Sequence, residues 1–364
     1  MSVTDERPSS RAGGLVLRCL TLVATGVLVA GCAASREPRA ERHSTGAPPR
    51  PSPTTAPLAL TVTSEPWSFG DAEGRLLRTP SYRILTTDDS PLVADRMPAF
   101  LEASLATYRT MFGPLPAPSA PLDVYLMATR PQWEALTRQT AGPRADIYLR
   151  IQRGGYSENG RAVFYNIGPR DTFAIAGHEG WHQYTQAVFR EALPIWLEEG
   201  ISVAMEGFRW DEQGEGRPVF LAWSNLERYD RLREVVISGR ATGLETLLNQ
   251  RPQDLLQDSS VATLDYYAQI WALTLFLRDA QGGRYRASLE RMLRDAAEGR
   301  MVATVSAATS AREARWSAVN RLGDAPFRAY FGPVGDAAPA FDAFLRAMVR
   351  PGGRSAVLEG RSPE

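Results

Sequence analysis

The amino-acid sequence predicts an α+β fold, with a small sheet-containing N-terminal lobe at residues 61–170 and a mostly helical lobe at residues 171–350. Two observations lead to this prediction. Short apolar runs typical of strands alternate with helical periods before residue 170, and the apolar spacing after residue 171 is almost entirely helical. No period of 20–50 residues recurs, so a repeat architecture is not expected.

The N-terminal lobe begins with a strand at 81–87, followed by a helix at 92–112 whose apolar residues recur every three or four positions until Gly113 and Pro114 end it. A second strand at 122–127 precedes a short helix at 131–139, which has proline at its first position. A third strand at 162–167 follows the string Gly154-Gly155-Tyr156. That string could form a sheet edge to which an extended peptide adds, or a surface hairpin without a ligand.

Apolar periodicity predicts the helices of the C-terminal lobe. They are expected at 172–190, 194–206, 219–238, 264–280, 284–298, 305–321 and 338–349. Residues 351–364 are rich in Gly, Arg and Ser, and we expect a flexible tail there.

The composition limits the classes of partner. The chain has 364 residues, 41 basic and 41 acidic, and 44% of its residues are hydrophobic. This length suffices for two lobes around a shared site. The balanced charge gives no general attraction to nucleic acid, so no nucleic-acid partner is expected. The expected oligomeric state is a monomer.

The N-terminus has the pattern of an export signal over residues 1–31. Arg11 and Arg18 precede an apolar run, Cys19–Ala30, that is too short to span a bilayer as a helix. The string Leu28-Val29-Ala30-Gly31-Cys32 resembles the bacterial lipobox, which implies that Cys32 is lipidated and becomes the mature N-terminus. An ordinary secretory signal with a chance cysteine is the alternative.

A Pro-rich tether is expected at residues 32–60, because its composition offers too little apolar surface to offset the entropy of ordering. We therefore expect a lipid-anchored protein of the bacterial cell envelope, held off its membrane by a spacer. No Asp follows Cys32, so the outer membrane is the expected destination in an organism that has one.

The chemistry is concentrated at residues 178–182. The chain has only three histidines; His43 lies in the tether, and His178 and His182 are four residues apart within the string His-Glu-Gly-Trp-His. On a helix with Asp171 as its N-cap, both imidazoles face one side and can share one Zn²⁺ ion. Glu179 lies beside them, where it can act as general base. A chance occurrence of these residues on an ordinary solvated helix is the alternative.

Two histidines are too few for a catalytic zinc, which usually has three protein ligands. The string Leu193-Pro194-Ile195-Trp196-Leu197-Glu198-Glu199-Gly200 lies on the next expected helix. It offers two adjacent carboxylates as the third ligand, with a tyrosine as the alternative ligand type. Trp181, Trp196 and Trp271 are interpreted as core packing rather than as a substrate platform.

These motifs resemble the gluzincin zinc metallopeptidases, and most closely the peptidase MA-like family. The resemblance covers roughly residues 80–300 and implies a zinc site between the two lobes. There a Trp-Leu-x-Glu-Gly string supplies the third ligand, so Glu199 inherits that role, with Glu198 as the alternative. Tyr267, in Tyr267-Ala268-Gln269-Ile270-Trp271, is then the residue that hydrogen-bonds the developing oxyanion.

The resemblance implies a zinc-dependent peptide hydrolase acting on a peptide or protein. Thermolysin-like enzymes carry an acidic residue four positions after the ligand glutamate, but Val203 stands there in this chain, so an orienting carboxylate must come from elsewhere. The alternative function is a non-catalytic envelope lipoprotein that keeps the fold for binding or scaffolding.

Overall fold

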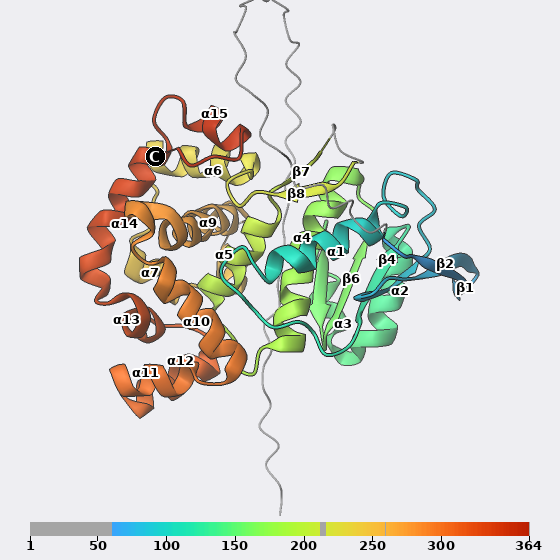
Figure 1. Ribbon diagram of the computed structural model, residues 1–364, viewed down its shortest axis with the longest axis horizontal. Helices are drawn as coiled ribbons and strands as arrows, with labels where there is room; N and C mark the ends of the chain where they lie inside the picture. The colour runs from blue at the N-terminus through green and yellow to red at the C-terminus, as the bar shows by residue number, and fades with distance from the viewer. Residues whose placement is uncertain (1–59, 212–215, 259, 364) are drawn as a thin grey trace, which may run out of the picture.

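A six-stranded sheet forms the N-terminal part of the computed structural model, which describes residues 60–211, 216–258 and 260–363 (Figure 1). The strands are β1 (Thr63–Phe69), β2 (Ala72–Arg78), β3 (Tyr82–Thr86), β4 (Leu122–Met127), β5 (Gly155–Glu158) and β6 (Arg161–Tyr165). Their spatial order is β1-β2-β3-β4-β6-β5. The central strands β3, β4 and β6 are parallel, whereas the pairs β1–β2, β2–β3 and β5–β6 are antiparallel.

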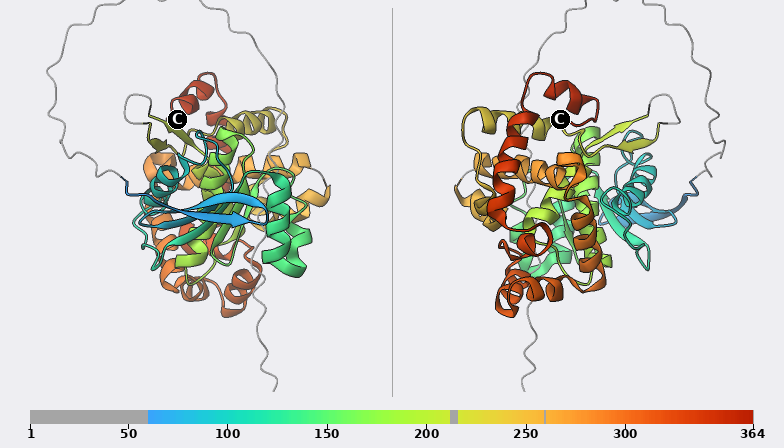
Figure 2. Two further views of the ribbon diagram at one scale, coloured as in Figure 1. Left: turned by 90° about the vertical axis from the view of Figure 1, so that its right-hand side faces the viewer. Right: turned by 60° about the vertical axis from the view of Figure 1, so that its left-hand side comes forward.

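Alternating side chains of the central strands enter two separate cores. Val124 and Phe164 belong to the large core that also contains α1 and α4, whereas Met127 and Val163 belong to a smaller core with α2 and α3. The helices of this part are α1 (Met97–Tyr108), α2 (Arg130–Ala141), a 3-10 turn at Gly142–Arg144, and α3 (Ala145–Tyr148). The sheet is therefore covered on both faces, while β1 and β2 extend away from the helical part (Figure 2).

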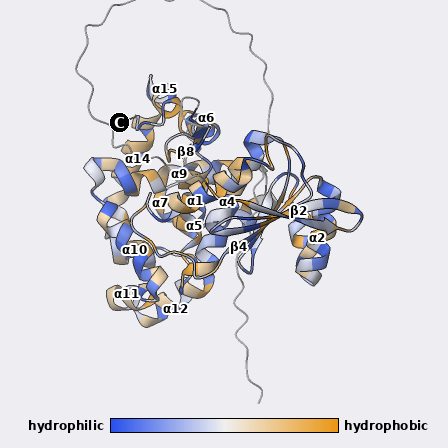
Figure 3. Cartoon of the chain, turned by 45° about the vertical axis from the view of Figure 1, so that its right-hand side comes forward, coloured by the Kyte–Doolittle hydropathy of each residue, from blue (hydrophilic) through white to orange (hydrophobic). Residues whose placement is uncertain are grey.

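Helices dominate the rest of the chain. They are α4 (Pro169–Val188), α5 (Ile195–Met205), α6 (Leu226–Ile237), α7 (Leu244–Asn249), α8 (Pro252–Asp258), α9 (Ser260–Gly283), α10 (Arg286–Glu298), α11 (Met301–Ala308), α12 (Ala311–Asn320), α13 (Ala325–Phe331), α14 (Val334–Met348) and α15 (Gly353–Leu358). A small antiparallel pair, β7 (Phe208–Trp210) and β8 (Pro218–Phe220), follows α5. Hydrophobic and hydrophilic residues both occur along α10 and α14, as expected for helices with one buried face (Figure 3).

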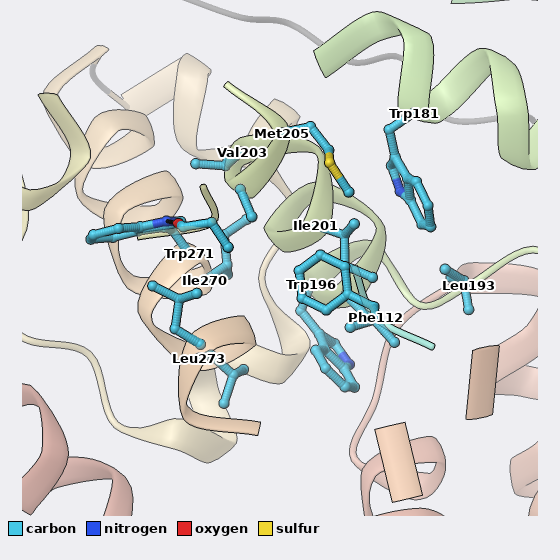
Figure 4. Close-up of a cluster of buried hydrophobic side chains, with 14 of the residues drawn as sticks. Phe112, Trp181, Leu193, Trp196, Ile201, Val203, Met205, Ile270, Trp271 and Leu273 are labelled. Carbon is cyan, nitrogen blue, oxygen red and sulfur yellow. Dashed lines mark hydrogen bonds between the residues drawn. The ribbon is translucent and has the colours of Figure 1, made fainter. Parts of the chain in front are cut away.

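Helix α5 lies at the centre of the molecule, and each of its residues is buried. Trp181 of α4 lies on one side of it, and Ile270 and Trp271 of α9 lie on another (Figure 4). The indoles of Trp181, Trp196 and Trp271 are fully buried, which confirms their interpretation as core residues. Because α5 is packed on all sides, its position relative to α4 is fixed. Both helices carry residues of the site described below.

The mixed α+β class, with the sheet in the N-terminal part and helices in the C-terminal part, is confirmed. The single helix expected at 305–321 is wrong, since α11 and α12 are separated at Ser310, whose side chain accepts from the amide of Glu313 and caps α12. The tail also differs from expectation. Gly353–Leu358 forms α15, in which Ala356 and Val357 are buried and which packs against α6.

The signal sequence, Cys32, His43 and the tether up to residue 59 lie outside the described residues. Within residues 60–211, 216–258 and 260–363, no helix combines the length and the apolar character needed to cross a bilayer.

Candidate metal centre

Helix α4 carries the two histidines. Proline occupies its first turn and Gly168 is its N-cap residue, so Asp171 lies within the first turn and not at the expected N-cap position. His178 and His182 are one turn apart, and their ring centroids lie 5.0 Å from each other. Both rings are buried, at 0% and 4% exposure for the two residues. The sequence spacing thus places both imidazoles on one buried face of the helix.

Glu199 comes from α5 and lies against both rings. Its Oε2 atom is 3.7 Å from His178 Nε2 and 3.8 Å from His182 Nε2. A tetrahedral metal with bonds of about 2.0–2.1 Å separates its ligand atoms by about 3.3 Å, so small side-chain movements would suffice to bind one ion. These three buried residues form a group that could hold a metal ion.

Glu198 faces a different atom. Its Oε1 lies 3.0 Å from His182 Nδ1 and accepts a 2.6 Å hydrogen bond from the hydroxyl of Thr185. The two adjacent glutamates therefore occupy opposite sides of the His182 ring, Glu199 at Nε2 and Glu198 at Nδ1. Between the two carboxylates that the sequence left open, the geometry favours Glu199 as ligand and gives Glu198 an orienting position.

Glu206 holds the other histidine and was not anticipated from the sequence. Its Oε1 lies 2.9 Å from His178 Nδ1. Arg228 donates to both carboxylate oxygens of Glu206 at 3.2 and 3.3 Å, and the Asn225 amide donates to Oε2 at 2.9 Å. Glu206 follows Glu199 by seven positions, which is two helical turns, so this spacing was the available signal. It supplies the orienting carboxylate that Val203 cannot.

The surrounding carboxylates favour positive charge between them. Burial lowers the pKa of His178, but the nearby Glu199 and Glu206 outweigh burial and raise that pKa to about 10. Burial opposes ionisation of Glu206 as well, yet the Arg228 guanidinium and His178 bring the pKa of Glu206 to about 2. A group with this electrostatic preference attracts a cation, and neutral imidazoles with a carboxylate are ligands that zinc accepts.

Several buried polar atoms at the site lack a hydrogen-bond partner among the described residues. They are His182 Nε2, Glu199 Oε2 and both carboxylate oxygens of Glu179. His178 Nε2 lies within hydrogen-bond distance of the Ser202 hydroxyl, at 3.2 Å, although that hydroxyl also donates to the Glu199 carbonyl at 2.7 Å. Buried groups without partners are costly, and a metal ion would bind the ligand atoms among them. The donor set therefore fits a metal of the zinc type.

Glu179 is fully buried next to these ligands. Burial is the main reason why its pKa is raised, while the neighbouring histidines act in the opposite direction. Its backbone is held by β5, because the Ser157 hydroxyl donates to the Glu179 carbonyl at 2.6 Å. A carboxylate with a raised pKa and no partner is suited to accept and return a proton.

Tyr267 reaches the site from α9. Its ring centroid is 6.5 Å from that of His178, and the guanidinium carbon of Arg228 lies 5.5 Å from its centre. Burial raises the pKa of Tyr267 well above its usual value, so its hydroxyl stays protonated and able to donate.

A cavity of about 440 Å³ extends to His178 from the side of α4, β7 and the start of α6. Its wall includes Ile175, Phe208 and Trp210, together with Glu206 and Asn225. On the sheet side, β5 is the edge strand and packs against α4. A Cβ atom at Gly155 would lie 2.7 Å from the Phe164 Cβ, which explains why glycine stands in this strand.

No protein-family model matches the chain, and no curated protein matches its sequence.

Proposed function

We propose that this chain is a zinc-dependent peptide hydrolase of the cell envelope, akin to the peptidase MA-like gluzincins. The observation that carries the proposal is the convergence of Glu199 Oε2 on the Nε2 atoms of His178 and His182, with the unpaired, buried carboxylate of Glu179 beside them. Two imidazoles and one carboxylate are a ligand set used by catalytic zinc in peptidases.

The metal would be held by His178, His182 and Glu199. When bound, zinc supplies Lewis acidity, which polarises a carbonyl and makes water acidic near neutral pH. Glu206 and Glu198 lie within hydrogen-bond distance of the Nδ1 atoms of His178 and His182, so with Nδ1 as donor on each ring both Nε2 atoms would be available as metal ligands.

Glu179 is the proposed general base. Its carboxylate takes a proton from the water that attacks the scissile carbonyl, and later delivers that proton to the leaving amine. Its raised pKa supports this double role, because a carboxylate that holds a proton too weakly cannot return it. Tyr267 would donate its hydroxyl proton in a hydrogen bond to the carbonyl oxygen as negative charge develops there.

A peptide is the proposed substrate class. The edge position of β5, next to the helix that carries His178, supports binding of an extended backbone by strand addition. The cavity beside His178, partly walled by Ile175, Phe208 and Trp210, offers room for a side chain of that peptide.

Retention of the fold solely for scaffolding is the competing function. The buried carboxylate of Glu179 lacks a hydrogen-bond partner and so destabilises the folded protein. A protein that served only as a scaffold would not need this carboxylate. This cost supports the catalytic alternative, because strain and unmet polar groups are tolerated where chemistry needs them.

Attachment to a membrane through a lipid on Cys32 is part of the proposal. It rests on the sequence at residues 28–32 and on the Pro-rich segment that follows. A lipid anchor with a spacer would hold the hydrolase in the envelope of a bacterium, at the outer membrane where one exists.

The proposal is tested by removing and restoring zinc. Chelated protein should lose cleavage of an unbiased peptide library and regain it with one equivalent of zinc, whereas His178→Ala should bind no zinc and cleave nothing. Cleavage that persists without metal would disprove the zinc mechanism. A wild-type protein that binds one zinc but cleaves no peptide would favour the scaffold.

A further inference from the structure

An arginine from the C-terminal helices reaches the start of the helix that carries Glu199. Arg321 follows α12, and its guanidinium Nε donates to the Leu193 carbonyl at 2.7 Å. Its own carbonyl accepts from the amide of Ile195, the first residue of α5, at 2.8 Å. Arg321 thus binds the chain on both sides of Pro194, where α5 has no side-chain cap.

The same guanidinium extends to the orienting carboxylate. Arg321 Nη2 lies 3.8 Å from Glu198 Oε2, while the other oxygen of Glu198 lies 3.0 Å from His182 Nδ1. Both side chains are mostly buried, at 13% exposure for Arg321 and 7% for Glu198. Charge interactions at such depth are screened less than those at the surface.

The backbone at Arg321 makes this contact costly to maintain. Its φ of 57° lies in the left-handed region, where glycine is the usual residue after a helix. An arginine there is strained relative to glycine, so a purely structural turn would be better served by glycine. The guanidinium contacts with Leu193 and Glu198 are interactions that glycine could not make.

Aromatic side chains also pack between α5 and α13, close to Arg321. Trp196 of α5 lies 6.0 Å from Phe327 and 6.4 Å from Phe331, measured between ring centroids, and both phenylalanines belong to α13. Helix α13, which follows Arg321, is therefore packed against the first turn of α5.

We propose that Arg321 is a positioning residue that orients His182 through Glu198 and fixes the first turn of α5, so that metal binding depends on the C-terminal helices. The inference rests on the proposed zinc site. It parallels the arrangement at His178, where Arg228 holds Glu206. Each histidine is then oriented by a glutamate that an arginine holds in place.

Zinc affinity of folded variants tests this role. Arg321→Met and Arg321→Gly should both raise the zinc dissociation constant by about 10–100-fold, as for other losses of ligand-orienting groups. Arg321→Lys, which keeps the positive charge, should weaken zinc binding less than either. Arg251→Met is the matched control, because Arg251 donates to Asn320 at 3.2 Å, next to Arg321 in the chain. It should leave affinity unchanged.

The glycine variant separates positioning from folding. It removes the left-handed strain, so its melting temperature should stay at or above that of Arg321→Met while its zinc affinity stays equally weak. The proposal would be overturned if zinc affinity fell in step with melting temperature across the variants. It would also be overturned if Arg321→Met bound zinc as tightly as wild type.

Imidazole NMR provides a readout that needs no metal. With three histidines in the chain, three sets of ring ¹⁵N signals are expected, and His178 and His43 serve as internal references. Arg321→Met should shift the His182 ring signals and leave those of His178 in place. Unchanged His182 signals would contradict the proposal even if wild-type protein failed to bind zinc, an outcome that would itself refute the proposed function.

Discussion

At the scale of single residues, the sequence reveals the ligands more readily than the groups that orient them. His178 and His182 are recognisable because their spacing matches one face of a helix, Glu179 because it lies beside them, and Glu199 because its string resembles that of the gluzincins. Glu206 has no such string and is brought to His178 by the course of α5. Arg228 and Arg321 contact the orienting glutamates from distant segments, and no local pattern in the sequence announces such contacts.

Removal of the charge from Glu206 should weaken metal binding. Glu206→Gln leaves His178 Nδ1 without its carboxylate, so we expect zinc affinity to fall about 10–100-fold by competition with a chelating indicator. Glu227→Gln is the matched control, since Glu227 is exposed and lies near Arg228 without a hydrogen bond to His178. Equal affinity in the Glu206 variant and wild type would show that this contact does not orient the ligand.

Loss of the Tyr267 hydroxyl should affect turnover and not metal content. Tyr267→Phe should lower kcat roughly 10²–10³-fold, as expected for one lost oxyanion donor, while zinc stays at the wild-type level. The neighbouring Tyr266→Phe should turn over normally. Full activity in Tyr267→Phe would remove Tyr267 from the mechanism, and Tyr266 would become the next candidate.

At the scale of elements, glycines that disfavour a helix mark places of close approach. Gly177 and Gly180 lie within α4, and the sequence alone suggests a packing need such as a close neighbouring backbone. A Cβ atom at Gly177 would lie 2.6 Å from the Met205 carbonyl oxygen, and one at Gly180 would meet the Tyr108 hydroxyl. The spacing between α4 and α5, and with it the distance from the histidines to Glu199, therefore depends on the missing side chain at Gly177, whereas the one at Gly180 allows the close approach of Tyr108 from α1.

Alanine at Gly177 should separate the two ligand helices. We expect Gly177→Ala to reduce the free energy of unfolding by about 1–3 kcal/mol, because overpacking outweighs the gain in helix propensity. Gly335→Ala in α14 is the control, since no heavy atom lies within 4 Å of its added Cβ. It should be neutral or slightly stabilising in denaturant unfolding. A Gly177 variant as stable as wild type would show that α4 and α5 can adjust.

Elements with a fully buried face were the easiest to predict. The strand at 122–127 and the helices at 172–190, 194–206 and 264–280 were expected within a few residues of their observed bounds, whereas the helix expected at 219–238 begins only at Leu226, after β8. β1 was missed because most of its side chains are exposed and its apolar alternation is weak, although Gly70-Asp71 between two extended runs is a hairpin signal. α14 was expected to begin near Pro339, but it starts at Val334 and continues through the proline.

At the scale of the whole molecule, segments far apart in sequence meet at one site. Ser157 of the sheet holds the backbone of Glu179, Glu199 and Glu206 come from the region of α5, and Arg321 follows α12. The periodicity of apolar residues predicted that a sheet-containing part precedes a helical part. It did not predict these long-range contacts, because the contacts depend on how helices without distinguishing motifs pack together.

Cellular location is a property of the whole chain. Cys32→Ser should release the protein into a soluble fraction or leave its signal sequence uncleaved, because the lipid acceptor is gone. Fractionation with detection of the signal sequence checks this. Unchanged processing and unchanged membrane association in the variant would contradict lipidation at Cys32.

The central claim, that Glu179 acts as general base beside a zinc ion on His178, His182 and Glu199, is tested most directly by Glu179→Gln. The measurement is cleavage of an unbiased peptide library by wild type and variant, each loaded to the same zinc content. We expect equal zinc content and a melting temperature no lower than that of wild type, with cleavage reduced at least 10²–10⁴-fold in the variant. A Glu179→Gln protein that hydrolyses peptides as fast as wild type would contradict it.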